Sequence, residues 1–592
     1  MMANRPLVTG ICANRMRICL MLGKPFPIPP RRSLHMKSLS TVSVPCLMTF
    51  DRLRLGLLAI ASVVSLTSCG GGSGDSSASA TPAGNALYAA STTLADQCVA
   101  PRPPGTVDAY TGVVYQDQQG TLATELAWIR SFINETYLWF DEVPAIDLAK
   151  YVVGATVEYI EPADNIRSQR MLATPADATV AFFNSQRTLQ LTASGRPKDR
   201  FHFTYPTPEW SALSQAGVTT GYGFDVALLS SRPPRKAIVA FSTAGSTAEA
   251  NRIVRGTEFI SVDGVDVANG SDTATINEGL FTPDVGKSHT FQVLDPGSTV
   301  PRTVTMTAGQ VTSQPVQNVA LLPTAAGTVG YMLFNDHIAT AESQLISAVN
   351  TFKAADGGAG IRDLVLDMRY NGGGFLYLAS ELAYMIGGGA ATAGKIFEGL
   401  VYNSKIAANP KYDNTPFYTT SSGRDGARGQ ALPQLNLKRV FMLTGVGTCS
   451  ASESVINGLR GVGVQVIQIG LATCGKPYGF VPEENCGTTY FAIQFKGVNA
   501  AGFGDYADGF SPSGSGNAAD QLPGCAVADD FSRALGDPAE GRLAAALQYR
   551  VDGTCPVAAA GKRAGTLAQA LLEPRLLRSA LRENRWLTPR GQ

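Results

Sequence analysis

Ser450 and Lys476 each lie in a turn that directly follows a predicted strand. Ser450 follows an apolar run at residues 440–443 and a glycine-containing turn, and Lys476 follows a second, β-branched run at residues 464–469. If the two runs are neighbouring strands of one sheet, both side chains lie at the same rim. A serine hydroxyl becomes an effective nucleophile when a base removes its proton. A lysine can be that base if burial lowers its pKa from about 10.4 toward roughly 7–8.

Glu453 stands three positions after Ser450, which is about one turn of the helix expected to begin there. Two interpretations are open. Its carboxylate could orient Lys476, or it could cap the helix in an S-x-x-E pattern. Ser452 and Ser454 are alternative nucleophiles on the same segment.

Two segments of this region resemble the catalytic signature of the carboxyl-terminal processing peptidases, also called tail-specific proteases. They are residues 448–453 (TCSASE) followed by Gly475-Lys476, and residues 366–374 (LDMRYNGGG). The resemblance extends over roughly residues 120–557. It implies a serine endopeptidase with a multidomain α/β architecture. The expected parts are a crotonase-like (ClpP/crotonase) protease domain, a β-rich PDZ-like domain and an N-terminal helical domain.

The resemblance implies a role for each site residue. Ser450 is the nucleophile, Lys476 is the base, and the backbone N–H groups of Gly373 and Ala451 form the oxyanion hole, with the preceding glycine as the alternative to Gly373. Each such donor stabilises the transition state by roughly 2.7–4 kcal/mol. Many family members carry Gln four residues after the lysine, whereas this chain has Phe480. An alternative is therefore a catalytically weak peptide-binding protein on the same fold, and a further one is a crotonase-like enzyme acting on acyl thioesters.

A second resemblance lies upstream. Residues 253–264 are similar to a PDZ sequence pattern, and residues 244–250 are expected to form a short helix lining a groove. Successive backbone N–H groups of a glycine-containing loop can hold the terminal carboxylate of a peptide. The candidate loop, which taken alone could be any hairpin, consists of Gly221, Tyr222, Gly223 and Phe224. Polypeptide substrates recognised through their C-terminal tails are the expected partners.

The N-terminal part, up to residue 69, contains the pattern of an export signal. Residues 1–47 show no clear pattern, and one interpretation is that translation begins at Met48. Residues 48–69 have a basic start, an apolar stretch and a lipobox ending at Cys69, and residues 70–97 form a predicted flexible linker. These features predict a lipid-anchored protein at the periplasmic face of a bacterial membrane, with the outer membrane favoured. An ordinary cleaved signal peptide is the alternative.

Length and composition set the remaining limits. The 592 residues, of which 44% are hydrophobic, suggest about three or four domains, and the net charge of +1 argues against a nucleic-acid partner. The C-terminal tail carries seven Lys/Arg and two Glu, hence a net charge of +5 (7 − 2), and a solvated tail is favoured over one that touches the membrane or the enzyme. The expected domains are residues 98–215 (helical), 216–312 (PDZ-like), 313–557 (protease) and 558–592 (tail).

Six cysteines follow Cys69, an even number that predicts disulfides in an exported protein. Cys474 could pair with Cys449, if Ser450 and Lys476 meet, or with the local Cys486. The sequence leaves this choice open. Neither a metal site nor a cofactor is expected, because the chain has no C-x-x-C pair, four histidines and no phosphate-binding loop.

Overall fold

The computed structural model describes residues 88–281, 283–406, 414–513 and 518–556, together with the backbone of two short strands, Arg575–Leu576 and Arg585–Trp586. All of them belong to one compact unit, Thr81–Gln592. The predicted signal peptide at residues 48–69, with Cys69, lies outside the described residues. Within the described part of the chain, no helix is both long and apolar enough to cross a membrane.

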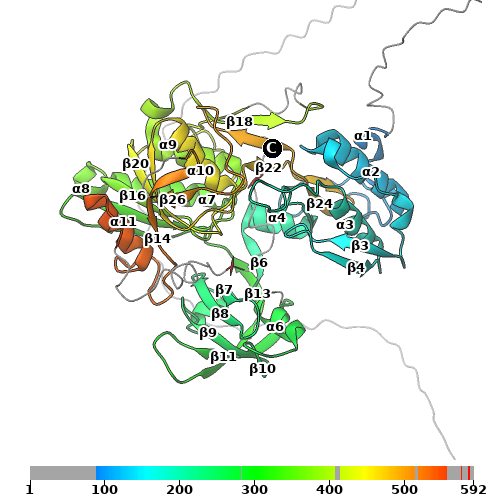
Figure 1. The fold of residues 1–592 in the computed structure, drawn as a ribbon, viewed down its shortest axis with the longest axis horizontal. Helices are drawn as coiled ribbons and strands as arrows, with labels where there is room; N and C mark the ends of the chain where they lie inside the picture. The colour runs from blue at the N-terminus through cyan, green and yellow to red at the C-terminus, as the bar shows by residue number, and fades with distance from the viewer. Residues whose placement is uncertain are drawn as a thin grey trace, which may run out of the picture. The chain divides into compact units, whose positions relative to one another are not determined.

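A seven-stranded sheet forms the centre of the C-terminal half (Figure 1). Its first strand, β14, is antiparallel to its neighbour, and the other six run parallel to one another. In spatial order the strands are β14 (Val316–Leu322), β15 (Val329–Phe334), β16 (Asp363–Asp367), β20 (Arg439–Thr444), β21 (Gln465–Gly470), β27 (Gln521–Ala526) and β26 (Ser511–Ser513). The two runs that precede Ser450 and Lys476 are therefore adjacent parallel strands, as the sequence analysis required.

Both faces of this sheet are buried, and alternate residues of each strand serve opposite faces. Along β15, Met332 and Phe334 belong to the hydrophobic cluster of one face, and Tyr331 and Leu333 belong to that of the other. Strands that are buried on both faces consist of continuous apolar residues, and this is why the sequence pattern predicted their positions. The helices of the first cluster are α7 (Ala341–Lys353), α9 (Leu376–Thr392) and α10 (Ala451–Gly461), and that of the second is α11 (Gly541–Asp552).

The N-terminal region differs from its prediction in two places. The predicted linker already contains structure, because α1 (Ser91–Leu94) and β1 (Gln97–Cys98) lie within residues 70–97. Apolar residues at spacings of three and four predict a helix over residues 121–145, whereas α2 spans Leu122–Thr136. It stops early because the chain turns extended at Tyr137 and the Leu138 N–H donates to the Ile493 carbonyl oxygen instead.

Residues 98–215 are not an independent helical domain. Besides α3 (Pro175–Ser185) and α4 (Thr207–Ala216), they contain a hairpin of β3 (Thr156–Ile160) and β4 (Arg167–Met171). Their strand β5 (Phe203–Pro206) pairs with β24 (Thr488–Phe491), whose other neighbour is β23 (Glu483–Asn485), and a disulfide joins Cys98 to Cys486. One hydrophobic cluster includes side chains from both regions. The predicted boundary therefore separates segments that share a core.

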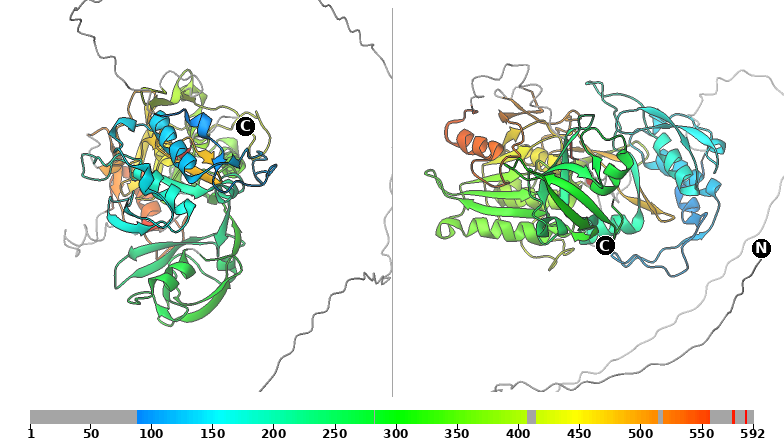
Figure 2. Two further views of the ribbon diagram at one scale, coloured as in Figure 1. Left: turned by 90° about the vertical axis from the view of Figure 1, so that its right-hand side faces the viewer. Right: turned by 90° about the horizontal axis from the view of Figure 1, so that it is seen from below.

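Residues 218–312 form a β-rich domain with its own hydrophobic cluster, shown in green in Figures 1 and 2. Its main sheet has the order β12-β11-β9-β8-β7, and β6 (Val218–Gly221) pairs with β13 (Gly309–Thr312). Two helices accompany these strands, α5 (Thr247–Ala250) and α6 (Thr273–Leu280). The main strands are β7 (Phe224–Ser230), β8 (Lys236–Ser242), β9 (Glu258–Val262), β11 (Ser288–Leu294) and β12 (Arg302–Thr307), and β10 (Val265–Asp266) pairs with β9.

Two short strands are described within the predicted tail, residues 558–592, and both pair with strands of the folded body: β28 (Arg575–Leu576) with β7, and β29 (Arg585–Trp586) with β17 (Gly374–Phe375). These four residues therefore contact the enzyme, which is one of the two alternatives considered for the tail. The remainder of the predicted tail lies outside the described residues. The nearest anchored point before the tail is the disulfide between Cys525 and Cys555.

Candidate active site

Ser450 occupies a sharp turn between β20 and α10. It is fully buried and has φ 59° and ψ −112°, a backbone conformation that is rare for a residue with a side chain. Such strain persists only where the surrounding structure enforces it, and it clusters at functional sites. Ser452 and Ser454, the alternative nucleophiles, instead direct their hydroxyls to carbonyl oxygens, those of Asn371 and Ser450.

Lys476 comes from the loop after the neighbouring strand β21. Because Leu443 of β20 is in register with Ile469 of β21, the two strands end at the same level and both loops leave the same rim. The Lys476 side chain is fully buried. Its Nζ lies 4.0 Å from the centroid of the Phe480 ring and 4.8 Å from that of Phe201.

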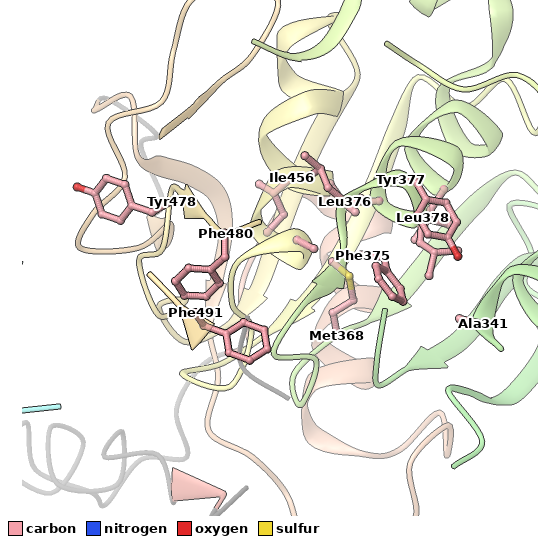
Figure 3. Close-up of a cluster of buried hydrophobic side chains, with 14 of the residues drawn as sticks. Ala341, Met368, Phe375, Leu376, Tyr377, Leu378, Ile456, Tyr478, Phe480 and Phe491 are labelled. Carbon is pink, nitrogen blue, oxygen red and sulfur yellow. The ribbon is translucent and has the colours of Figure 1, made fainter. Parts of the chain in front are cut away.

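Phe480, the departure from the family pattern, belongs to an aromatic cluster beneath the lysine. Figure 3 shows the Phe480 and Phe491 rings next to each other, with centroids 5.9 Å apart, and Phe203 stacks on Phe491 at 4.3 Å. The amine itself lies over the faces of Phe480 and Phe201, in a fully buried position.

Glu453 connects the two candidate catalytic residues. One carboxylate oxygen, Oε2, accepts the main-chain N–H of Ser450 at 2.9 Å and that of Lys476 at 2.8 Å. The other, Oε1, accepts the Gly475 N–H at 2.9 Å and the Thr473 hydroxyl at 2.5 Å. Burial raises the pKa of Glu453, and these four donors partly offset that rise. The carboxylate therefore caps α10, in agreement with the S-x-x-E pattern, and it also holds the main chain of the lysine loop.

A disulfide joins the residues next to the serine and the lysine. Cys449 is bonded to Cys474, which resolves the choice that the sequence left open. Cys486 is bonded to Cys98 instead. Cys449, Glu453 and Cys474 lie close enough to hold a metal ion, but the two sulfur atoms are bonded to each other and offer no thiolate.

The glycine loop after β16 lies against the serine turn. The Asn371 carbonyl oxygen accepts the Cys449 N–H at 3.0 Å and the Ser452 hydroxyl at 2.9 Å. The Gly373 N–H, the predicted oxyanion donor, donates to Asn371 Oδ1 at 3.0 Å, so a substrate oxygen has to share or replace that bond. Ala451 is the first residue of α10, where main-chain N–H groups have no acceptor within the helix.

His337, which follows β15 and lies against the glycine loop, is a buried group that was not predicted from the sequence. Its Nδ1–H donates to Asn371 Oδ1 at 3.0 Å, and its main chain exchanges hydrogen bonds with Gly373 and Phe375. Burial lowers the pKa of His337 to about 3, so the ring is neutral at physiological pH. The sequence signal available was its position three residues after a buried strand, which alone does not separate it from a packing histidine.

Arg200 is a second group of the site for which the sequence predicted no role. Its Nη2 donates to the carbonyl oxygens of Cys474 at 2.8 Å and Gly475 at 3.0 Å. Arg196 also donates to the Cys474 oxygen, at 3.2 Å. Burial lowers the pKa of Arg200 to about 10, which leaves it protonated. The N-terminal region therefore holds the main chain of the lysine loop. His202, expected to be structural, is buried against Phe183.

The β-rich domain also contacts the glycine loop. The Arg255 guanidinium donates to the Tyr370 hydroxyl at 2.6 Å and to Asp529 Oδ1 at 2.6 Å. Tyr370 precedes Asn371, and Asp529 accepts a further bond from Arg369 at 2.6 Å. These buried charges connect the β-rich domain to the segment that supplies the predicted oxyanion donor.

The predicted tail-binding loop lines a hollow of about 690 Å³, whose other side is formed by residues of the N-terminal region, including Glu209 and Ala212 of α4. Leu280, at the end of α6, lines the same hollow, whereas no residue of α5 does. The helix expected to flank the groove at residues 244–250 is therefore not the one that does so. The loop residues concerned are Gly221, Tyr222, Gly223 and Phe224.

The comparisons with known proteins agree with this geometry. Residues 328–481, which include the glycine loop, the serine turn and the lysine loop, match the model of peptidase family S41. The chain carries a peptidase family S41 domain. It is accordingly a serine-type peptidase, and the resemblance inferred from the two motifs is confirmed.

Solved structures of other proteins are similar to this chain beyond the S41 domain. An S41 protease from Bacteroides fragilis NCTC 9343 is similar over 72% of this chain and 97% of its own, with a TM-score of 0.51 and 22% identity. This likeness supports a multidomain S41 fold of mixed α/β content. The photosystem II D1 C-terminal processing protease also matches, over 72% of this chain and 100% of its own, at 18% identity and a TM-score of 0.38. No curated protein matches this chain.

Proposed function

We propose that this protein is a serine endopeptidase in which Ser450 and Lys476 form a nucleophile–base dyad on a crotonase-like fold. The observation that carries the proposal is the shared carboxylate of Glu453, which accepts the main-chain N–H groups of both residues. The Cys449–Cys474 bond reinforces the same junction. Because these bonds fix the main chain at Ser450 and at Lys476, the two side chains start from defined positions. This reduces the entropy cost of reaching the transition state.

The reaction then follows from these groups. The Ser450 hydroxyl oxygen attacks the carbonyl carbon of the scissile peptide bond, and its proton passes to the neutral amine of Lys476. The oxyanion accepts hydrogen bonds from Ala451 and Gly373, the latter exchanging its bond to Asn371. Collapse of the intermediate breaks the C–N bond, and Lys476 returns the proton to the departing amine. A water molecule, deprotonated by Lys476, releases the acyl group from the serine.

We infer that the substrates are exported or misfolded polypeptides captured by their C-terminal tails. The β-rich domain is proposed as a PDZ-like module, because its 221–224 loop lines a hollow next to β7, the last strand that the domain itself contributes to its main sheet. A peptide added to such an edge gains main-chain hydrogen bonds regardless of its sequence. The module contacts the catalytic segment through Arg255 and Tyr370. We further propose lipidation at Cys69, at the periplasmic face of a bacterial membrane, which mass spectrometry of the mature N-terminus tests.

The test of the proposed activity compares the wild type with Ser450→Ala and Lys476→Ala on an unfolded protein substrate. Both variants are expected to lose activity by at least about 10³-fold, since members of a catalytic unit act together. Ser452→Ala is the matched control, because it removes a hydroxyl from the same turn that bonds only to Asn371. Full activity of Ser450→Ala would exclude the dyad.

A catalytically weak peptide-binding protein is the second candidate. Two observations favour it: Phe480 stands where many relatives carry Gln, and the Gly373 N–H is bonded to Asn371. In that case the wild type would bind a C-terminal tail peptide but hydrolyse the unfolded substrate no faster than Ser450→Ala.

A further inference from the structure

The C-terminal tail of this chain adds a strand to the free edge of β7. Arg575 pairs with Leu228 and Leu576 pairs with Ala227, in antiparallel register. The opposite edge of β7 is already occupied by β8. β28 therefore sits where an added peptide strand extends the sheet, on the strand that directly follows the 221–224 loop.

Ten residues further on, the same tail adds a strand beside the catalytic loops. Arg585 pairs with Gly374 and Trp586 with Phe375, in parallel register, and Gly374 directly follows the predicted oxyanion residue Gly373. β29 also lies beside β22 (Tyr478–Gly479), which begins two residues after Lys476. It therefore lies near both the glycine loop and the lysine loop, where an extended substrate has to bind.

One tail can reach both positions at once. Arg585 lies nine positions after Leu576 (585 − 576), a separation that an extended chain can bridge over at most about 30 Å. Because β28 and β29 are covalently joined to the body, they compete with a free peptide at an effective concentration, which is of the order of millimolar for linked binding segments in general. Both pairings use the main chain, which makes them independent of a particular side-chain sequence.

We propose that the two strands β28 and β29 act as an intramolecular ligand that competes with polypeptide substrates for the edge of β7 and for the main chain of Gly374–Phe375, next to the glycine loop. This inference rests on the proposed function, since it assigns an occupant to the same two sites. The tail imitates the binding mode of a substrate, and an incoming polypeptide has to displace it. Release of the tail is then the step that makes both sites available.

The experiment uses full-length Ser450→Ala protein, so that no cleavage intervenes, and a labelled synthetic peptide with the sequence of residues 571–592. Two variants weaken the internal strands by removing N–H donors: Arg575→Pro/Leu576→Pro and Arg585→Pro/Trp586→Pro. Combining them is expected to tighten peptide binding at least about ten-fold, because the millimolar internal competitor is lost. The same four positions changed to Ala keep every N–H and are the matched control, expected to bind the peptide less tightly than the proline variant.

Hydrogen exchange provides a second measurement on the same proteins. Peptides that cover Ala227–Leu228 and Gly374–Phe375 are expected to exchange faster in the proline variant than in the alanine variant. Equal peptide affinity and equal exchange in both would overturn the inference, as would an affinity that depends on protein concentration, which indicates a tail supplied by a second copy. Hydrolysis is measured separately, with the combined proline variant that carries the native Ser450. If this protein binds the peptide but does not hydrolyse the unfolded substrate, the proposed function is contradicted and the inference is not. If it hydrolyses the substrate but the proline and alanine variants bind the peptide equally, the inference is contradicted and the proposed function is not.

Discussion

Ser450 and Lys476 donate their main-chain N–H groups to the same oxygen atom, Oε2 of Glu453, at 2.9 and 2.8 Å. The two residues are 26 positions apart in the sequence (476 − 450). A single buried carboxylate therefore fixes the nucleophile turn and the lysine loop relative to each other. The first prediction follows from this arrangement.

Glu453→Gln is expected to lower kcat much more than it raises KM. The amide has the size of the carboxylate, but an NH₂ group takes the place of one of the two acceptor oxygens. That NH₂ donor would then face the N–H groups, or the Thr473 hydroxyl, that now donate to the carboxylate. A buried polar group left without its partner costs about 1–3 kcal/mol, so stability should fall by that order as well. Steady-state kinetics and urea unfolding measure the two effects. Unchanged kcat in a less stable protein would show that Glu453 serves the fold alone.

Loss of the Cys449–Cys474 bond is expected to reduce both activity and stability. The bond closes a segment with a sequence separation of 25, for which chain entropy predicts roughly 3 kcal/mol of stabilisation. Cys449→Ser/Cys474→Ser also frees the serine turn from the lysine loop, so kcat should fall.

The Cys525–Cys555 bond provides the matched control, because it has a similar separation of 30 and joins neither catalytic loop. Cys525→Ser/Cys555→Ser should lose comparable stability and keep its kcat. Equal kcat losses in the two double variants would mean that the activity effect is general unfolding.

His337 should make the folded state sensitive to acid. The pKa of its ring is about 3 in the folded protein, below the ordinary value of 6.5, because the neutral ring is buried. Its contribution to stability is complete above pH 6.5 and is lost as the pH falls toward 3. In that range His337 binds a proton in the unfolded chain but not in the folded protein. The free energy of unfolding should therefore fall by up to about 1.4 kcal/mol per pH unit in that range.

His337→Asn is the variant that tests this slope. Its amide N–H can still donate toward Asn371 Oδ1, but it does not titrate. Urea unfolding between pH 7 and pH 4 should show a shallower decline in the variant than in the wild type. Parallel curves would assign the acid sensitivity to other groups.

The contact between Arg255 and Tyr370 predicts that the β-rich domain influences catalysis. Tyr370→Phe removes the hydroxyl that accepts from Arg255 and that also bonds to Asp529, a buried carboxylate. The expected result is a loss of kcat of about 10- to 150-fold, which corresponds to the roughly 1.5–3 kcal/mol that one hydrogen bond to a charged group provides. Peptidase assays with and without a tail peptide measure it.

Arg302→Lys is the control for this prediction. Arg302 also belongs to the β-rich domain, but it pairs with Asp295 inside that domain. It should leave kcat unchanged, whereas Arg255→Lys, with one ammonium in place of a planar fork, should resemble Tyr370→Phe. If Arg255→Lys behaves like Arg302→Lys, the contact does not couple the two parts.

The sequence alone determined the core strands, the strand-to-helix turn at Ser450 and the family. Strands buried on both faces, such as Val329–Phe334, must be apolar throughout, so local composition reveals them. Only the tertiary structure decided the partner of Cys474, the two sets of hydrogen bonds of Glu453, the contacts of His337, the end of α2 at Thr136 and the pairing of β28 and β29. Each of these depends on which segments, distant in the sequence, lie side by side in the fold, and no local sequence pattern specifies that.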